Sequence, residues 1–227
     1  RIDEHTGLDV GFLITNKKGN YLSLGKSNFT HTQGLFFFNH DNWELYKTIE
    51  DIKLNKEMTA LKNNLFNVQR IYKDEAEESF NLFNNSLVYS VKNYVGELVL
   101  ELDFRGMFDY DDKGRIYTVS EEDDLIVIRY DKFTDHSLSL IDKTRFLVIK
   151  GADRYNKIGE WIKKEYSYDA SRGSRSEFYV YKAISIPVEH NLELVFSFSE
   201  DKERAKAHAN QIYENKHYLL SSFHKYV

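Results

Sequence analysis

Residues 161–172 combine large aromatic rings with charged side chains, a composition typical of binding surfaces. The group contains Trp161, Tyr166, Tyr168, Asp169 and Arg172. Aromatic rings beside charged planar groups are suited to the flat faces of sugars and to the surfaces of partner proteins. The alternative is that Trp161 and Tyr166 simply cap the hydrophobic core, which is the commoner use of such side chains. The sequence leaves both roles open.

No set of catalytic residues can be selected from the sequence. Glycoside hydrolysis needs two carboxylates that flank the scissile bond, but the 36 acidic residues offer no preferred pair. The chain has no cysteine, and residues 25–29 lack the final glycine of a G-x-S-x-G serine turn. Gly173 is an isolated glycine rather than part of a phosphate-binding loop. We therefore assign no catalytic residue and expect no cofactor.

A metal site is not indicated either. The eight histidines show neither H-x-H nor H-E-x-x-H spacing. Residues 109–114 begin like a calcium loop, with Asp109, Asp111 and Gly114 at the first, third and sixth positions. The twelfth position is Ser120, so the bidentate glutamate of such a loop is missing. We interpret this stretch as an acidic turn and expect no metal.

The composition favours a β-rich globular protein that binds neither nucleic acid nor membranes. The 227 residues include 16 tyrosines, 16 phenylalanines and 2 tryptophans, which suit half-buried strands better than helices. The net charge of −5 does not create the positive field that a phosphate backbone requires. The longest apolar run, residues 35–38, is far shorter than the roughly 20 residues of a membrane span. The absence of cysteine fits the reducing cytosol, and we expect a cytoplasmic protein.

Alternation of apolar and polar residues predicts strands through the second half of the chain. In residues 97–104, apolar residues share one face and acidic residues fill most of the other, so we expect a core face and a solvent face. Residues 87–91, 125–130 and 145–150 are predicted as further strands. Residues 178–186 and 192–198 form two more, and Pro187 and Asn191 between them indicate a hairpin or tight return.

The N-terminal third contains one clear hairpin and one ambiguous segment. Residues 11–14 and 21–24 flank a turn-like stretch with Gly19, which predicts a hairpin. Between residues 54 and 72, apolar residues repeat at steps of four and three, which is helical spacing. The turn-like residues 62–64 and the β-branched Val68 and Ile71 favour strands instead. We expect strands here, with a helix as the alternative.

The C-terminal residues predict a helix that begins near residue 200. Ser199 can cap this helix, and Glu200 and Asp201 place negative charge at the positive end of its dipole. Its narrow apolar stripe consists of Ala205, Ala209 and Ile212. Because a finished β-domain offers no obvious partner for this stripe, we expect a further domain to pack on it.

Several short stretches, taken in order, resemble the N-terminal domain of prokaryotic, especially archaeal, glycogen-debranching enzymes (amylo-α-1,6-glucosidases). The matching stretches are residues 33–37 (QGLFF), 102–105 (LDFR) with Phe108 and Asp109, 161–172, and 199–202 (SEDK). The resemblance extends over nearly the whole chain. It implies an all-β fold, a β-supersandwich of galactose-mutarotase-like topology over residues 1–199, followed by a C-terminal linker helix over residues 200–227.

The resemblance also implies a function and a partner. In such enzymes the linker helix leads to an α/α toroid, which carries the two acids that hydrolyse the α-1,6 branch linkages of glycogen or related α-glucans. The domain described by this sequence would then be non-catalytic, with the toroid of the same full-length chain as its partner. Asp103 and Arg105 match the family's D-x-R strand end, where they brace a loop or line the groove facing the toroid. A buried ion pair is the expectation for such a short charged motif.

The candidate residues for carbohydrate contact or for the domain interface are Asp103, Arg105, Trp161, Tyr166, Asp169 and Arg172. Two alternative functions remain open. The aromatic group around Trp161 is compatible with a free-standing carbohydrate-binding module. A mutarotase-like sugar epimerase would share the sandwich topology, although the scattered histidines argue against it.

Overall fold

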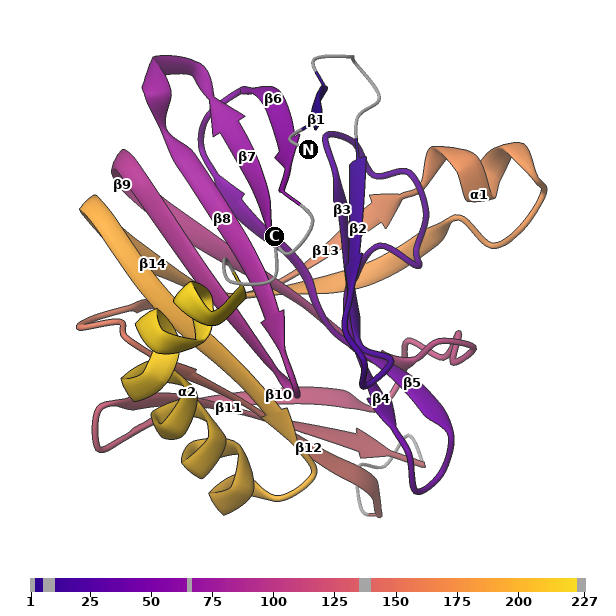
Figure 1. Cartoon of the computed structure of the whole chain (residues 1–227). Helices are drawn as coiled ribbons and strands as arrows, with labels where there is room; N and C mark the ends of the chain where they lie inside the picture. Colours follow the sequence, from indigo (N-terminus) through magenta and orange to yellow (C-terminus); the bar gives the residue numbers. More distant parts are fainter. Residues whose placement is uncertain (1–2, 6–10, 65–66, 135–139, 224–227) are drawn as a thin grey trace.

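The computed structural model describes residues 3–5, 11–64, 67–134 and 140–223, and these residues form an all-β sandwich with a C-terminal helix. The fourteen described strands join into one antiparallel sheet that folds into two layers (Figure 1). The fold class predicted from the sequence is therefore confirmed. No helix within these residue ranges is both long and apolar enough to cross a membrane.

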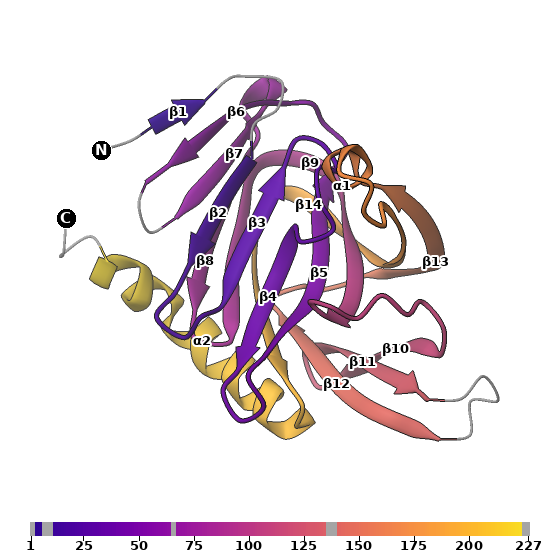
Figure 2. The ribbon, with the colours of Figure 1, turned by 90° about the vertical axis from the view of Figure 1, so that its right-hand side faces the viewer.

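The two layers are connected because β9 (Ser86–Gly106) and β14 (Glu177–Ser199) each contribute one half to either layer. Besides these halves, the first layer contains β1 (Asp3–His5), β6 (Met58–Asn63), β7 (Val68–Tyr72), β8 (Glu77–Phe83), β10 (Arg115–Glu122), β11 (Leu125–Phe133) and β12 (Ile141–Lys150). The second layer contains β2 (Gly11–Thr15), β3 (Tyr21–Gly25), β4 (Gly34–Asn39), β5 (Glu44–Leu54) and β13 (Asn156–Glu165). Figure 2 shows β2 to β5 side by side.

The core lies between the layers and is rich in aromatic rings. Phe12 of β2 lies 5.5 Å from Phe80 of β8, measured between ring centroids. Phe37 of β4 stacks on Phe198 of β14 at 5.0 Å. These contacts join strands that are distant in the sequence, which explains the aromatic excess of the composition. Residues 58–63 and 68–72 are strands, as expected, so the helical spacing of residues 54–72 does not produce a helix.

The predicted hairpin between residues 186 and 192 is wrong, because β14 continues through this stretch as one bent strand. Pro187 pairs opposite Glu97 of β9. Proline has no N–H to donate to a neighbouring strand. This is tolerated at Pro187 because β9 is the only described strand that pairs with β14 between Ser185 and Val195. The bend comes from the left-handed backbone of His190, with φ 77°, and from a register shift between His190 and Leu192.

The face of β9 that was predicted to be wet is also buried in part. Leu98, Leu100, Leu102 and Phe104 face the core as expected. On the other face, however, Glu101 and Asp103 are also buried. Charged side chains from neighbouring strands cover them. Alternation along one strand identifies its two faces, but it does not reveal what other segments bring to the second face.

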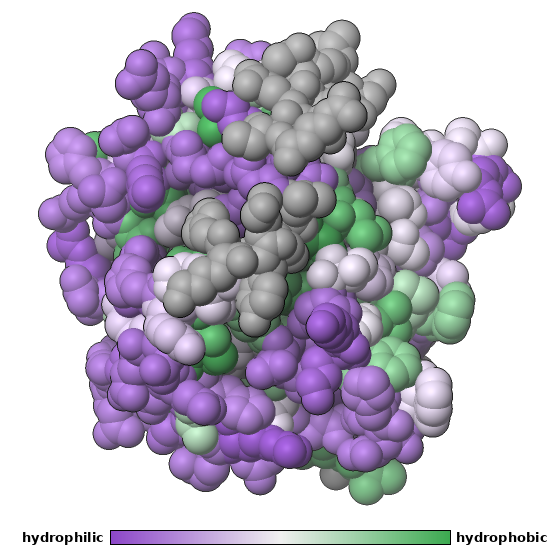
Figure 3. Space-filling model, viewed as in Figure 1, coloured by the Kyte–Doolittle hydropathy of each residue, from purple (hydrophilic) through white to green (hydrophobic). Residues whose placement is uncertain are grey.

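The C-terminal helix α2 (Lys202–Phe223) packs on the outer face of the first layer, so the prediction of an unpartnered apolar stripe is wrong. Ala205 and Ala209 are buried against Leu125, Val127 and Val148. Ile212 is buried in a neighbouring group formed by Phe83, Val88 and Val195. The β-domain itself therefore covers the stripe. The side of α2 that faces the viewer in Figure 3 is mainly hydrophilic.

The start of α2 differs by two residues from the expected position. Ser199 Oγ accepts a hydrogen bond from the Asp201 amide, and Asp201 Oδ1 accepts one from the Arg204 amide at 2.7 Å. Asp201 therefore caps the helix, and Ser199 supports the turn before it. Glu200 lies outside the helix and forms an ion pair with Arg145 at 3.1 Å. Residues 224–227 of the predicted helix lie outside the described residues.

Candidate functional site

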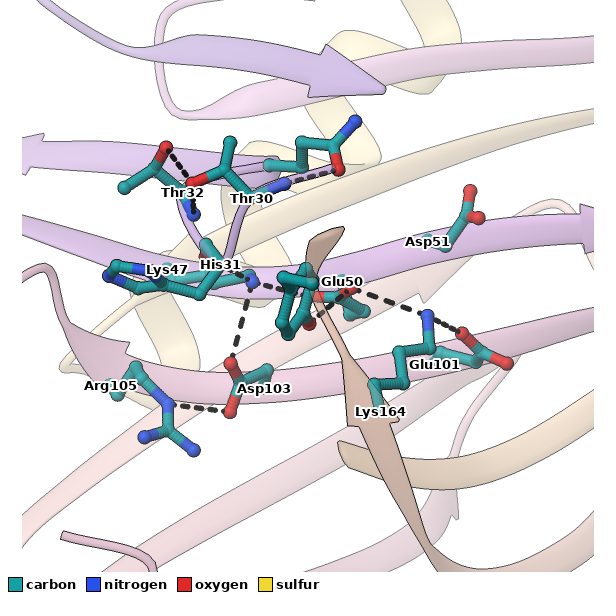
Figure 4. A network of polar contacts seen from close by, with 12 residues as sticks. Thr30, His31, Thr32, Lys47, Glu50, Asp51, Glu101, Asp103, Arg105 and Lys164 are labelled. Carbon is teal, nitrogen blue, oxygen red and sulfur yellow. Dashed lines mark hydrogen bonds and ion pairs between the residues drawn. The ribbon is translucent and has the colours of Figure 1, made fainter. Parts of the chain in front are cut away.

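The six candidate residues divide into a buried charged group and an exposed surface. Asp103, Arg105, Tyr166 and Asp169 are buried, whereas Trp161 is 40% exposed. Asp103, Arg105 and Tyr166 belong to what we call the Lys47–Asp103 network (Figure 4), and Asp169 lies at its edge. The network consists of Lys47, Glu50, Glu101, Asp103, Arg105, Asp112, Arg115, Lys164 and Tyr166.

Lys47 of β5 lies at the centre of this network and has no solvent exposure. Its ammonium group forms an ion pair with Glu50 and lies 3.4 Å from Asp103 Oδ2. It also donates a hydrogen bond of 2.9 Å to the His31 carbonyl. Residues 47 and 50 would point to opposite faces of a regular strand. Register shifts on both sides of Ile49 bulge β5 and bring the two side chains together.

Glu50 connects the centre of the network to the end of β13. The Tyr166 hydroxyl donates a hydrogen bond of 2.7 Å to Glu50 Oε1, and Lys164 Nζ lies 3.3 Å from the same oxygen. Lys164 also pairs with Glu101 at 2.5 Å. Burial alone would raise the pKa of Glu50, but Lys47 and Lys164 outweigh this effect and lower it. Glu50 is therefore ionised at neutral pH.

Asp103 is held by two arginines, and Arg115 of β10 connects it to the first layer. The guanidinium groups of Arg105 and Arg115 each lie 2.7 Å from Asp103 Oδ1, so the predicted buried ion pair between Asp103 and Arg105 is confirmed. Arg105 also pairs with Asp112 at 2.8 Å, which makes residues 109–114 an acidic turn that faces arginines. Burial would raise the pKa of Asp103, but Lys47, Arg105 and Arg115 hold it well below its usual range.

Asp169 is attached to the edge of the network through His31. Asp169 lies in the short helix α1 (Ser167–Ser171). Its carboxylate accepts hydrogen bonds from the His31 amide at 2.7 Å and from Thr30 Oγ1 at 3.0 Å, and it lies 2.8 Å from His31 Nδ1. The carbonyl of the same histidine binds Lys47. Asp169 therefore fixes the loop that covers the network.

Gly34 is required beside the network because there is no space for a side chain. Its φ of +115° is a conformation that residues with a side chain rarely adopt. A Cβ atom would collide with the Ile49 carbonyl and would lie 2.8 Å from Lys47 Cε. The glycine of the QGLFF stretch thus allows β4 to approach the bulge of β5.

An aromatic surface lies on β13 and β14 and consists of the exposed Trp161 and Tyr179 and the half-buried Tyr181. We call it the Trp161 surface. Trp161 and Tyr181 are cross-strand partners whose rings lie 5.0 Å apart. Tyr179 lies two residues from Tyr181 on the same face of β14 and is 47% exposed. Aromatic rings in a row along two strands can stack against successive sugar rings.

Arg115 connects the Trp161 surface to the buried network. Its guanidinium lies 5.0 Å from the Trp161 ring, and it donates a hydrogen bond of 2.9 Å to the Tyr179 carbonyl. Asp103 holds Arg115 in this position. The same residues that close the network therefore fix two members of the exposed surface. Arg172 is not part of this arrangement, since its guanidinium lies over the ring of Tyr168 at 5.3 Å.

Glu50 and Asp103 are not suited to act as a general acid. A glycoside hydrolase needs a carboxylic acid whose pKa is raised, so that it can protonate the leaving oxygen. The pKa values of Glu50 and Asp103 are lowered instead, and both carboxylates are held by cations. Among the residues with described positions, no group of three or more histidine, aspartate or glutamate side chains is placed to hold a metal ion.

Sequence reasoning missed several members of the network, namely Lys47, Glu50, Glu101, Arg115 and Lys164. Glu101 lies in the predicted strand 97–104, on the face expected to be wet, whereas Lys47, Glu50, Arg115 and Lys164 lie in strands that the sequence analysis did not predict. The only available signal was the charge density near the D-x-R stretch. The partners come from β5, β10 and β13, so their convergence depends on the tertiary fold.

The comparisons with known proteins identify no family. The sequence matches no protein-family model, and no curated protein is significantly similar to it. The resemblance to glycogen-debranching enzymes therefore stays a prediction.

Proposed function

We propose that this chain is a non-catalytic β-sandwich domain that binds α-glucan, and that it belongs to a glycogen-debranching enzyme as its N-terminal domain. In this proposal a catalytic α/α toroid of the same full-length chain hydrolyses the α-1,6 branch linkages. The sandwich supports the toroid and shapes the groove that receives the glucan. A cytoplasmic location, where glycogen is stored, is part of the proposal.

The Trp161 surface is the observation that carries the binding role. Trp161 is 40% exposed although tryptophan is one of the largest apolar side chains, and Tyr179 beside it is 47% exposed. Arg115 lies over the ring of Trp161 and donates a hydrogen bond to the main-chain carbonyl of Tyr179. A rigid, exposed aromatic surface loses little conformational entropy when a ligand stacks on it, so binding is stronger than on a mobile one.

The non-catalytic role is supported by the state of the buried carboxylates. Asp103 is ionised and held by two arginines, and Glu50 is ionised and held by lysines. These side chains stabilise the sandwich and its exposed surface. We expect the chain to release no glucose from a branched limit dextrin, and sustained release would contradict the non-catalytic assignment.

Electrophoresis in gels with and without glycogen tests the binding role. We expect glycogen to retard the wild-type chain, and we expect Trp161→Ala to weaken the affinity by about tenfold or more, as for an aromatic residue at the centre of a binding surface. Tyr218→Ala is the matched control, because Tyr218 is a 72% exposed aromatic residue on α2. Equal retardation of the wild type and Trp161→Ala would remove the Trp161 surface as the binding site.

A free-standing carbohydrate-binding module is the second candidate, and the same exposed surface favours it. The two candidates differ in the toroid. Addition of a separately produced toroid should yield a stable complex only if the chain is a domain of the debranching enzyme. The absence of any complex, with glycogen binding intact, would favour the free-standing module.

A further inference from the structure

A second candidate site lies at the other end of the second layer, where a cavity of about 630 Å³ opens beside the first turns of α2. It is bordered by the residues that follow β4, by the β8–β9 turn and by the start of α2. In Figure 2 the loop between β4 and β5 lies close to this end of the helix. The volume falls in the range of roughly 300–1,000 Å³ that is usual for small-ligand sites.

The lining of this cavity combines an apolar wall with uncharged polar groups. Phe37, Phe38 and Phe198 supply the aromatic part. The polar part includes Asn39, Asn84 and His208. Burial and the nearby Arg204 lower the pKa of His208, so its imidazole is neutral at pH 7 and can both donate and accept a hydrogen bond. Such a mixture suits a ligand that carries hydroxyl groups on a flat apolar ring.

The charges around the cavity argue against an anionic ligand. The basic side chains that line the cavity are Lys18 and Arg204, and the carboxylates are those of Asp41, Glu200 and Asp201. Asp201 already accepts the Arg204 amide as the helix cap. The carboxylates would repel a phosphate or a carboxylate ligand, but they can accept hydrogen bonds from sugar hydroxyls.

Trp43 lies next to Phe38, a residue that lines the cavity, and has an unusual backbone conformation. Its side chain is 80% exposed, and its ring lies 5.8 Å from Phe38, which lines the cavity. Its φ of 55° is in the left-handed region, which is an outlier for a bulky residue. Hydrogen bonds on both sides maintain this turn, because Asn39 Oδ1 accepts the Asp41 amide at 2.9 Å and Asn42 Oδ1 accepts the Glu44 amide at 3.1 Å.

The two sides of the cavity are held in fixed positions by Arg145. This buried side chain pairs with Glu44 at 2.9 Å, just after Trp43, and with Glu200 at 3.1 Å, just before α2. Its guanidinium lies 3.8 Å from the ring centroid of Tyr46. Arg145 therefore fixes the turn that carries Trp43 relative to the start of α2 at the entrance of the cavity.

We propose that this cavity and Trp43 form a second carbohydrate site, which binds a short neutral oligosaccharide independently of the Trp161 surface. One sugar ring stacks on Trp43, and the next enters the cavity and exchanges hydrogen bonds with Asn39, Asn84 and His208. The choice of α-1,4-linked glucose units as the ligand rests on the proposed function. The cavity and the polar groups that line it are observed independently of that function.

The two tryptophans allow each site to be observed separately, since the chain contains only 2. In Trp161→Phe the fluorescence comes from Trp43, and in Trp43→Phe it comes from Trp161. We expect maltoheptaose to change the emission of Trp161→Phe in a saturable way, whereas inorganic phosphate at the same concentration changes nothing. No saturable change, or a change with phosphate alone, would overturn the second site.

The outcomes separate this inference from the proposed function. A response of Trp161 alone would overturn the second site and leave the proposed function standing. A response of Trp43 alone would support the second site and remove the Trp161 surface. No response of either residue would overturn both.

Two histidine variants on α2 check that the ligand enters the cavity. In the Trp161→Phe background, we expect His208→Ala to weaken the maltoheptaose affinity at least about fivefold, because a lining group is lost. His217→Ala is the matched control, since its side chain is 75% exposed on the same helix. Equal affinities of the two variants would contradict binding inside the cavity.

Discussion

The Lys47–Asp103 network and the Arg70–Glu78 cluster use the same interactions in different parts of the sandwich. In the cluster, Glu78 accepts hydrogen bonds from Arg70 Nε at 2.7 Å, from Tyr89 at 2.6 Å and from Tyr72. These four residues lie on the adjacent strands β7, β8 and β9. Glu78 is fully buried and Arg70 is 4% exposed.

The cluster also reaches the second layer, because Arg70 pairs with Asp51 of β5 at 3.3 Å. The network differs in its larger number of charged members and in its contact with the surface. Its members come from β5, β9, β10 and β13, so it joins both layers, and through Arg115 it ends behind the exposed Trp161. The cluster contacts buried groups of both layers, whereas the network also contacts the exposed Trp161 surface through Arg115. We therefore expect the two groups to stabilise the fold to a similar degree, and only the network to affect binding at the Trp161 surface.

The largest effects should appear when one partner of either group is removed. We expect Asp103→Asn and Glu78→Gln each to lower the free energy of unfolding by about 3–5 kcal/mol, because buried cations lose their counter-charge. Urea unfolding measures this change. Asp123→Asn is the control, since the Asp123 side chain is 82% exposed. A loss below about 1 kcal/mol for Asp103→Asn would show that the network carries little stability.

A smaller loss is expected from Gly34→Ala, which acts on the network alone. The new methyl group would press against the Ile49 carbonyl and Lys47, so the free energy of unfolding should fall by more than about 1 kcal/mol. Gly173→Ala also places a side chain at a positive φ, of +67°, but this value lies in the left-handed region that other residues sometimes adopt, and no atom lies within 4 Å of the added Cβ. Thermal unfolding of both variants compares a position that has a collision and a less favourable φ with one that has neither. Equal losses would contradict the close approach at Gly34.

Acid should weaken the network in a predictable direction. The pKa values of Glu50 and Asp103 are lowered from 4.5 and 3.8, so their stabilisation is complete above these values and is lost as the pH falls below them. We expect the wild type to lose more stability between pH 6 and pH 3 than Asp103→Asn does. Denaturant unfolding at both pH values measures the difference, and parallel losses would contradict the lowered pKa of Asp103.

The smallest effect is expected at Arg172, the candidate residue that lies outside the network. Its guanidinium lies over Tyr168, which is itself 40% exposed. We expect Arg172→Ala to change the free energy of unfolding by no more than about 0.5 kcal/mol and to leave glycogen binding unchanged. A clear loss of glycogen retardation would instead extend the binding surface to α1.

Local patterns predicted the strands well, because alternation reflects which side chains the core accepts. Leu98, Leu100 and Leu102 all face the core. The same pattern failed at Glu101 and Asp103, because their partners are brought by other strands. Pro187 indicated a turn, yet it lies in a strand with one described neighbour at that point. The strand continues through Pro187 because it pairs with β9, and the residues around Pro187 do not reveal this pairing.

The site was predictable in part for the same reason. The D-x-R stretch correctly indicated a buried ion pair between Asp103 and Arg105. Lys47 and Glu50 escaped detection because the bulge of β5 changes the face to which they point. The apolar stripe of α2 was recognised, but its partner was not, since the residues that cover it, Leu125, Val127 and Val148, come from two different strands of the first layer.

The most direct test of the account compares Arg115→Met with Arg70→Met in glycogen binding. Both substitutions remove a buried guanidinium, but only Arg115 contacts the Trp161 surface. At a temperature where circular dichroism shows both variants folded, we expect Arg115→Met to bind glycogen about tenfold more weakly than Arg70→Met, which should match the wild type. Equal affinities of the two variants would contradict the claim that the network positions a carbohydrate-binding surface.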